Sequence, residues 1–503
     1  LHSKSADQGD AMGQSNLGFC YETGVGVVKN LDKAFQLYKQ SAEQGNARGQ
    51  ANLAVAYSRG RGTAENKETA FYWYKKSAEQ GDLMGEHGAG FALYWGDGVE
   101  QNQSAGIIWF IKSAEQGFLL SQSQLGYAYF WGDGVAKDAS AAFKWNTIAA
   151  EQGNVLSQER LGDIFYWGEG VQKDTSQSYK WYLMAAAQGH HSSEHKVGQA
   201  YSFGHGVTAD DSTAAYWYTK AAQGGYDEAQ FNLGIAYGQG LGVKINSKSG
   251  FDWLKKAAEQ GYLDAQHLVG LAYMTGDGVL PDSKESIAWL TKAANNGHAD
   301  AKNSLGLAYE AGDGVSQNKG KALGLFSEAA KKGNPEAAFN LGLATSYGDR
   351  KNTSTSLEYL KRAYKQGQHS AGYRVAIQHL DQKSGFYFPR AAYDILQELV
   401  VISKSDSVTS TSFALLGYMH ANGLHVEKDV REALKYFEKL EPQNINSSAF
   451  ELIVPTLHTI LTPKQSQRYK PHLVTYLDEF CGSELNELDS KGFIENSVWP
   501  ILR

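Results

Sequence analysis

The chain has 503 residues, of which 42% are hydrophobic and 20% charged, and its formal net charge is −7. These values are typical of a folded protein and argue against a nucleic-acid-binding protein, which normally carries a basic patch. No run of about 18 apolar residues is present, so the sequence predicts no membrane span. The two cysteines, Cys20 and Cys481, lie near opposite ends of the chain, which excludes a disulfide framework and leaves the compartment open.

One phrase recurs along the chain at a fixed interval. The glycine that closes S-A-E-Q-G returns every 36 residues from Gly9 to Gly333, and a further copy ends two residues early at Gly367. A glycine pair, G-x-G, keeps the same interval in nine intact copies, and valine follows it in eight of them. A repeat of this length is typical of solenoid proteins, in which each repeat is a supersecondary unit stacked on its neighbours.

Each repeat predicts two helices. The first carries A-x-x-x-L-G-x-x-Y, as in residues 229–237, where the apolar positions share one helical face. The G-x-G-V phrase ends this helix, because glycine accepts the positive φ that a helix C-terminus often needs. The second helix follows an Asn or Asp, which is typical of an N-cap. The nine predicted caps are Asn30, Asn66, Asn102, Asp138, Asp174, Asp210, Asn246, Asp282 and Asn318.

The second helix of each repeat also carries A-x-x-W-x-x-x-A-A. Its tryptophan lies at a position where a helix faces its neighbours, so we predict that this residue belongs to the core. The seven copies are Trp73, Trp109, Trp145, Trp181, Trp217, Trp253 and Trp289.

These motifs together resemble the Sel1-like repeat, a relative of the tetratricopeptide repeat. The resemblance covers residues 1–367 and a further copy near 413–440. It implies an all-α fold, a right-handed α-solenoid superhelix of about ten to eleven 36-residue helix-turn-helix repeats, whose first helices line the concave side. Members of the family act as scaffolds and adaptors in bacterial envelopes, in host–pathogen signalling, in toxin neutralisation and in eukaryotic protein quality control. The resemblance therefore does not fix a function.

The pattern divides the chain into three parts. Residues 1–367 form the predicted repeat solenoid, and residues 368–440 read as degenerate repeats with an insertion. We expect residues 441–503 to form a helical capping region, because the terminal units of a solenoid must cover an open end of the core. A partner-binding module is the alternative for this last part.

One motif suggests enzyme chemistry. The phrase H-S-S-E-H, residues 191–195, matches the H-x-x-E-H of inverted zinc peptidases and raises the hypothesis of a metal-dependent hydrolase using His191, Glu194 and His195. His87 and His267 hold the repeat position of His195, however, and no third ligand is identifiable. We therefore interpret these histidines as surface residues and expect no enzyme activity, no cofactor and no metal.

Aromatic residues precede the glycine pair in only some repeats. The phrases Y-W-G, F-W-G, Y-W-G and S-F-G occur in repeats three to six, whereas the corresponding residues are Glu22-Thr23 in the first repeat and Gly238-Gln239 in the seventh. By resemblance to the tetratricopeptide repeat, these positions point into the concave groove. The predicted partner-binding residues are Phe91, Tyr94, Trp95, Tyr127, Phe130, Trp131, Tyr166, Trp167 and Phe203. The alternative is that they fill gaps between adjacent helix pairs.

The first turns of the first helices also change character along the chain. They carry Met84, Leu120 and Leu156 in the aromatic repeats, and then switch to acidic residues. The acidic residues are Glu228, Asp264, Asp300 and Glu336. The predicted inner surface is thus apolar in its N-terminal half and acidic at first turns in its C-terminal half.

We expect a non-enzymatic adaptor or scaffold that binds a protein or peptide partner on its concave face. We expect a monomer that binds no nucleic acid, with a bacterial periplasmic or exported location favoured over a cytoplasmic one. Three alternatives stay open: an immunity-type neutraliser of a secreted toxin, a binder of glycan strands, since aromatic platforms stack on sugars, and the metal-dependent hydrolase.

Overall fold

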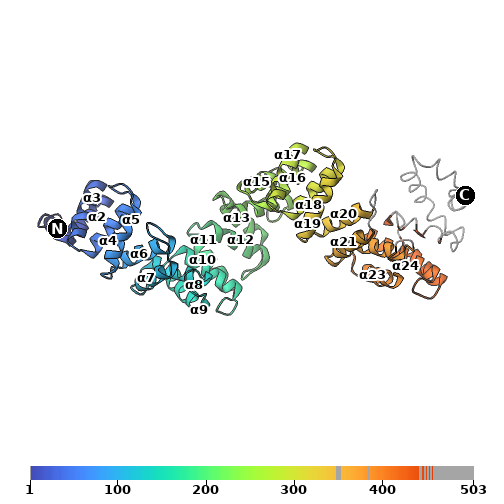
Figure 1. Cartoon of the computed structure of the whole chain (residues 1–503), viewed down its shortest axis with the longest axis horizontal. Coiled ribbons are helices and arrows are strands. Elements are labelled where there is room, and N and C mark those ends of the chain that lie inside the picture. The colour runs from blue at the N-terminus through green and yellow to red at the C-terminus, as the bar shows by residue number, and fades with distance from the viewer. Residues whose placement is uncertain are drawn as a thin grey trace. The chain divides into compact units, whose positions relative to one another are not determined.

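The computed structural model of the chain describes residues 2–346, 353–382, 385–440, 444–446, 449, 452–453 and 456. The described residues form 25 α-helices and no strand (Figure 1). The chain divides into two compact units, Leu1–Tyr262 and Leu263–Arg503, called unit 1 and unit 2 below. The predicted all-α solenoid of paired helices is confirmed.

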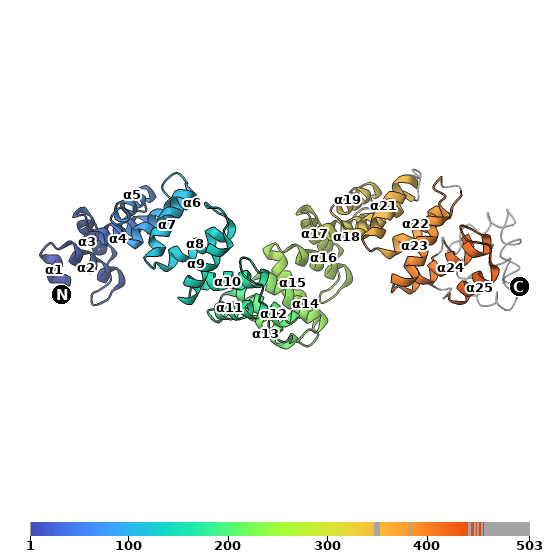
Figure 2. The same cartoon turned by 90° about the horizontal axis from the view of Figure 1, so that it is seen from below.

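Unit 1 consists of stacked helix pairs. From α2 onward the even-numbered helices are the first helices of the repeats and the odd-numbered helices are the second, and each pair packs together (Figure 2). The helices are α1 (His2–Asp7), α2 (Ala11–Thr23), α3 (Leu31–Glu43), α4 (Ala47–Arg59), α5 (Lys67–Ala78), α6 (Leu83–Trp95), α7 (Gln103–Glu115), α8 (Leu119–Trp131), α9 (Ala139–Glu151), α10 (Val155–Trp167), α11 (Thr175–Ala187), α12 (His191–Phe203), α13 (Asp211–Gln223), α14 (Asp227–Gln239) and α15 (Ser247–Gln260).

Unit 2 continues the same pairing, and the degenerate region after Gly367 also forms helix pairs, α22 with α23 and α24 with α25. Its helices are α16 (Leu263–Thr275), α17 (Ser283–Asn295), α18 (Ala299–Ala311), α19 (Lys319–Lys331), α20 (Pro335–Ser346), α21 (Thr353–Lys365), α22 (His369–Leu380), α23 (Pro389–Ile402), α24 (Asp406–Asn422) and α25 (Val430–Glu438).

The helix ends follow the predicted chemistry. All nine predicted Asn and Asp caps accept a hydrogen bond from a backbone N–H of the first turn, as Asn30 does from Lys33 at 2.9 Å. The first glycine of each G-x-G is left-handed, as at Gly96 with φ 76°. The second glycine allows a close approach, because a Cβ on Gly62 would lie 2.2 Å from the Leu31 carbonyl oxygen of the preceding repeat.

The core is repeated rather than shared by the whole chain. In five of the seven repeats with the conserved tryptophan the residue after it is buried, and Phe110 is fully enclosed. The seven tryptophans themselves are partly buried, so the prediction that they are core residues needs correction. Trp145, for example, packs against a cluster that contains Phe110 of the preceding repeat and Leu125 of its own repeat, while the indole stays partly accessible. These tryptophans therefore cover the joint between repeats.

Polar side chains also connect the two helices of a repeat at fixed positions. Ser41 Oγ donates to the Ala11 carbonyl oxygen at 2.6 Å, and Gln44 Nε2 donates to Gln14 Oε1 at 2.6 Å. The glutamine bond recurs as Gln80 to Gln50, Gln152 to Gln122, Gln188 to Gln158 and Gln260 to Gln230, with Gln116 to Glu86 as a variant. We call this row of bonds the amide ladder.

The C-terminal region is described in part. The tenth repeat loop, residues 347–352, and most of the predicted cap, residues 441–503, lie outside the described residues. The predicted return of the repeat is visible at Gly423, which is left-handed with φ 69°, and at Asp429, which caps α25. Across the described helices, none combines the length and apolar character that a membrane crossing requires.

Candidate functional site

Four neighbouring first helices of unit 1 end in an exposed aromatic residue. Helices α6, α8, α10 and α12 end at Trp95, Trp131, Trp167 and Phe203, each followed by a left-handed glycine. These side chains are 49%, 63%, 67% and 66% exposed, respectively. We call the four residues the aromatic ladder. Their exposure is unusual for such large apolar groups and makes this face of unit 1 the candidate binding site.

Two residues of the predicted binding surface are largely enclosed. Tyr94 is 1% exposed and Phe130 is 6% exposed, although Phe130 still lines a hollow on this face. Tyr94 lies one helical turn after Gly90, which faces Phe110, and the Tyr94 and Phe110 rings lie 5.8 Å apart. Tyr94 and Phe130 each lie four residues after the conserved glycine of their helix, Gly90 or Gly126, and therefore on the core side. This spacing can be read from the sequence.

The buried aromatic residue supports the exposed one beside it. The ring centroids of Tyr94 and Trp95 lie 5.0 Å apart, those of Phe130 and Trp131 5.0 Å and those of Tyr166 and Trp167 4.8 Å, all edge-to-face. Tyr94 is fixed in turn by a hydrogen bond from its hydroxyl to Asp133 Oδ2 at 2.8 Å. Each indole thus rests on a fixed ring, which lowers the ordering cost of binding a partner.

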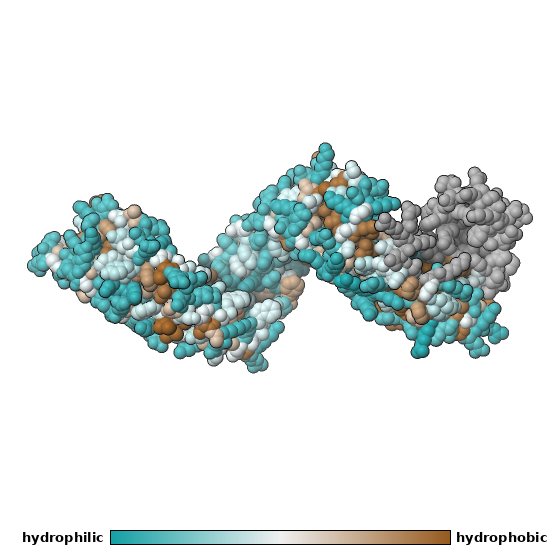
Figure 3. Space-filling view, viewed as in Figure 1, coloured by the Kyte–Doolittle hydropathy of each residue, from teal (hydrophilic) through white to brown (hydrophobic). Residues whose placement is uncertain are grey.

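Two hollows lie along this face. The first, about 540 Å³, is lined by the predicted Phe91 together with Met84, Leu120 and Leu156. The second, about 560 Å³, is lined by Trp131, Tyr166, Trp167 and Phe203. Figure 3 shows hydrophobic surface over the α6–α9 stretch. The hollows therefore bring together most of the predicted site residues.

The floor of the second hollow is an ion-pair network. Lys196 Nζ lies 2.7 Å from Asp163 Oδ1 and 3.1 Å from Glu159 Oε1. Burial disfavours the charge of Lys196, but the two carboxylates outweigh burial and raise its pKa. The Tyr182 hydroxyl donates to Asp163 at 2.7 Å. These charged groups are paired with one another. The network therefore holds the side chains that line the hollow in place and offers no free reactive group.

The residues of the H-S-S-E-H motif do not share one site. His191 Nδ1 lies 2.8 Å from Glu194 Oε2, and Lys220 Nζ lies 3.3 Å from the other Glu194 oxygen. His195 faces elsewhere: its Nε2 lies 2.8 Å from the Asn232 amide, and the residue is 2% exposed. The prediction that His195 is a surface residue is therefore wrong. Burial, with a smaller contribution from the charge of Lys196, lowers the pKa of His195 to about 4.

The H-S-S-E-H motif lies where one bond of the amide ladder is replaced. Glu194 occupies the ladder position, and the glutamine that would bond it is replaced by Gly224. A Cβ on Gly224 would lie 2.2 Å from the His191 ring, so the glycine makes room for the imidazole. His191 and Lys220 then satisfy the Glu194 carboxylate. The motif is accounted for as a local replacement of one ladder bond.

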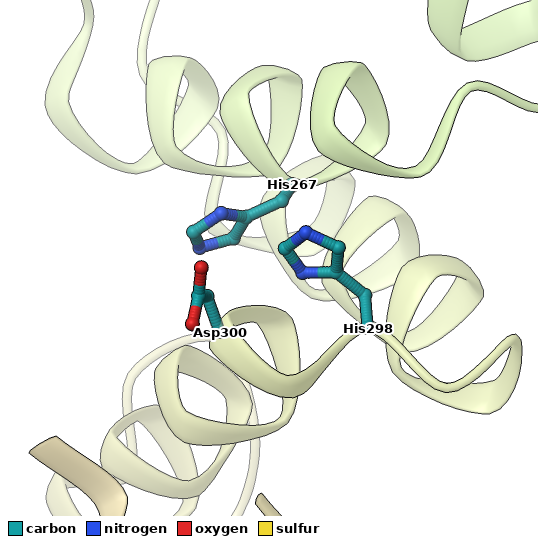
Figure 4. Close-up of side chains that lie close together, drawn as sticks. All are labelled: His267, His298 and Asp300. Carbon is teal, nitrogen blue, oxygen red and sulfur yellow. The ribbon is translucent and has the colours of Figure 1, made fainter. Parts of the chain in front are cut away.

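A second histidine cluster lies in unit 2. The ligand atoms of His267, His298 and Asp300 come within 4.8 Å of one another, as drawn in Figure 4. His298 caps α18, because its Nδ1 accepts the Ala301 N–H at 3.0 Å, and its Nε2 lies 2.7 Å from Asp264 Oδ1. A neutral imidazole has one acceptor nitrogen, and the cap occupies it. The geometry thus favours a joint between α16 and α18 over a preformed metal site.

The fold defines an α-solenoid protein with an exposed aromatic face. The profile of the Sel1 repeat matches residues 11–46, 47–82, 84–118, 119–154, 155–190, 191–226, 227–262, 263–298, 299–334, 335–368 and 414–440. The chain therefore belongs to the Sel1 repeat family, whose fold is in general a non-enzymatic scaffold for protein–protein interaction. Comparison with curated proteins gives no significant match.

One solved structure of similar length agrees with this assignment, and others are similar over part of the chain. The crystal structure of c5321, a protective antigen present in uropathogenic Escherichia coli strains, is 29% identical, covers 97% of this chain and 96% of its own, and has a TM-score of 0.69. A Sel1 repeat protein from Oxalobacter formigenes is 32% identical over 60% of this chain and 89% of its own, with a TM-score of 0.49. The immunity protein PA5088 from Pseudomonas aeruginosa is 20% identical over 41% of this chain and 82% of its own, with a TM-score of 0.29.

Proposed function

We propose that this protein is a non-enzymatic scaffold that binds a protein or peptide partner across the exposed face of α6, α8, α10 and α12. The observation that carries the proposal is the aromatic ladder, in which four neighbouring helices present large aromatic side chains to solvent. Exposed apolar patches of this kind mark interaction sites, and tryptophan is enriched at binding hot spots.

The exposure of the ladder argues against a role as filler between repeats. A gap-filling residue would be enclosed like Tyr94 or Phe130, whereas Trp131 and Trp167 are each more than 60% exposed. The equivalent position in α14 is Gln239, and the same helix geometry is kept there. The repeat fold therefore does not require the aromatic ladder, and a binding role would account for it.

The lining of the first hollow supports peptide rather than glycan. Met84, Leu120 and Leu156 offer aliphatic surface, which suits apolar side chains better than the hydroxyl groups of a sugar. Binding of a secreted toxin is one form that protein recognition by this face could take.

The test is selection of a displayed library of random 16-residue peptides on the intact chain. Peptides that bind the parent should lose about 30-fold or more in affinity on the variant Trp95→Ala, Trp131→Ala, Trp167→Ala, which corresponds to about 2 kcal/mol or more. The matched control is Tyr72→Ala with Tyr216→Ala, which removes exposed aromatic residues from the second helices α5 and α13.

The proposal fails if the triple variant binds the selected peptides as tightly as the parent does. It also fails if the control pair weakens binding as much as the triple variant. A pull-down from the native source with the same variants would then identify the natural partner, and capture of a secreted toxin lost only in the triple variant would specify the neutralising role.

A further inference from the structure

Positive charge gathers on the face that carries the aromatic ladder. On α10 this face is formed by Leu156, Arg160, Asp163 and Trp167, which are spaced at helical intervals and are all partly or largely exposed. At the equivalent positions of the first helices from α2 to α12, the charged residues are Arg48, Arg59, Arg160, Lys196 and Asp163. These positions thus carry four cations and one carboxylate, on a chain whose net charge is −7. The hollows are also lined by Asp97, which pairs with Lys67, and by Glu169, which pairs with Lys137.

Two of the four cations have an ion-pair partner and two do not. Arg48 Nε lies 2.9 Å from Asp82, and Lys196 is paired with Asp163 and Glu159. Within the described part of the chain, no carboxylate lies within 4.0 Å of the guanidinium of Arg59 or Arg160. The uncompensated charge on this face is therefore positive and is carried by two arginines.

Arg160 is held in a defined position without a carboxylate at ion-pair distance. Its Nη1 donates to the Ser123 carbonyl oxygen at 3.2 Å, and its guanidinium lies 5.1 Å over the predicted site residue Tyr127. Burial lowers the pKa of Arg160, and the more distant charges of Glu159 and Asp163 only partly oppose this effect. A half-buried guanidinium with neutral partners is a favourable place for a carboxylate, which arginine can bind through two parallel hydrogen bonds.

The two unpaired arginines, Arg59 and Arg160, lie next to the hollows. Leu156 lines the first hollow, and Asp163 and Trp167 line the second, so Arg160 lies on the turn of α10 between the two. Arg59 lines the first hollow. The order along this face is therefore an apolar hollow with a guanidinium at its wall, a second guanidinium, and an aromatic hollow.

We propose, resting on the proposed function above, that the partner segment is an acidic peptide. Its large apolar side chains occupy the two hollows, and a carboxylate between them binds Arg160, while a second carboxylate faces Arg59. Single-stranded nucleic acid and anionic glycans share the negative charge, but they lack aliphatic groups for Met84, Leu120 and Leu156. Charge complementarity together with apolar lining thus selects an acidic peptide with leucine-like and aromatic anchors.

The experiment uses the same library of random 16-residue peptides on the intact chain, and reads the composition of the selected peptides. Selected sequences should be enriched in Asp or Glu within a few residues of Leu, Phe or Trp. Affinity for one selected peptide should fall about tenfold or more in Arg59→Glu and in Arg160→Gln, and should weaken as salt is raised. Arg59 is exposed, so its variant keeps the test valid if Arg160→Gln is destabilised.

The matched control is Lys180→Glu, which reverses an exposed charge on the second helix α11 of the same repeat. It should change the affinity less than twofold. Selected peptides without acidic enrichment, or equal loss in Lys180→Glu, would overturn the acidic partner and leave the proposed function standing. No selection above the level of the triple tryptophan variant would overturn both. Binding of oligo(dT) or polygalacturonate, in place of peptide, through Arg59 and Arg160 would overturn the peptide class.

Discussion

Helices α10 and α14 occupy the same place in repeats five and seven, and they differ where the proposed site lies. Both end at a left-handed glycine with φ 76°, and both are followed by a capped second helix. The last two residues are Tyr166 and Trp167 in α10 but Gly238 and Gln239 in α14. Because the fold is the same in both, the repeat does not require an aromatic pair at the end of its first helix.

The comparison separates two kinds of tryptophan. Trp145 and its equivalents recur through seven repeats and cover the joint between neighbouring units, as a structural position does. Trp95, Trp131 and Trp167 occur in three neighbouring repeats, and the other six intact copies have no tryptophan at this position. All three are exposed. Recurrence along the array thus marks a structural position, whereas the local restriction of the exposed tryptophans is what the proposed binding role would account for.

The largest expected effect is on stability and tests the structural half of this comparison. Phe110 is fully buried between α6 and α7, so Phe110→Ala should cost about 3–5 kcal/mol of unfolding free energy. Trp131→Ala should cost about 1 kcal/mol or less, because the indole is 63% exposed and loses chiefly its edge contact with Phe130. Urea unfolding of the two variants measures the difference, and equal destabilisation would contradict the assignment of Trp131 to the surface.

The second prediction concerns pH. The pKa of His195 is about 4 in the fold, below its ordinary value, because burial disfavours the imidazolium. Glu228 lies 3.5 Å from Nδ1 and would favour protonation, but its side chain is 48% exposed and solvent screens it. The unfolded chain takes up the proton first as pH falls, so stability should decline between pH 6.5 and about 4, by up to about 3 kcal/mol from this residue.

The replacement His195→Asn tests that assignment, because Asn303 holds the equivalent position in α18. The variant should show a shallower decline of stability between pH 6.5 and 4. Part of the slope should remain, since burial also lowers the pKa of His87 to about 4. An unchanged slope in the variant would show that His195 is not held neutral by burial.

The third prediction concerns the caps of the second helices, which follow α10 and α14 as they follow the other first helices. Asp138→Ala and Asp174→Ala each remove an acceptor for the first turn of a second helix, and should each cost about 1 kcal/mol. The costs should add, because the sites lie in different repeats. Thermal melts of the single and double variants measure this, and a parent-like double variant would contradict the capping role.

The smallest expected effect concerns α14. Gly238→Ala should stabilise the chain by about 0.5–1 kcal/mol, because a Cβ there meets no atom within 4 Å and alanine has the higher helix propensity. Binding of the selected peptides should not change. A loss of binding would extend the recognition face into the seventh repeat and would remove the contrast drawn between α10 and α14.

Most of the fold was predictable because each repeat carries its own local signals. The capping Asn and Asp and the left-handed glycines lie where the sequence predicted them, since both depend on neighbours in the chain. The site was less predictable, because the sequence alone left open which of two adjacent aromatic residues faces the core. Tyr94 is buried and Trp95 exposed although they are neighbours. The spacing from Gly90 contained the answer, but the contact with Phe110 was needed to interpret it.

The contacts of the H-S-S-E-H motif could not be predicted from the sequence. Glu194 and Gly224 lie on different helices, and their relation appears only when the amide ladder is seen in three dimensions. The position of Arg160 over Tyr127 is equally a tertiary feature, since the two residues belong to different repeats.

The central claim is that the exposed tryptophans bind a partner and do not hold the repeats together. The most direct measurement is isothermal titration of one selected peptide into the parent and into Trp131→Ala, Trp167→Ala, with a thermal melt of each protein. The account predicts affinity about 30-fold or more weaker in the double variant with a melting temperature close to that of the parent. Unchanged affinity, or a melting temperature lowered as far as that of Phe110→Ala, would contradict it.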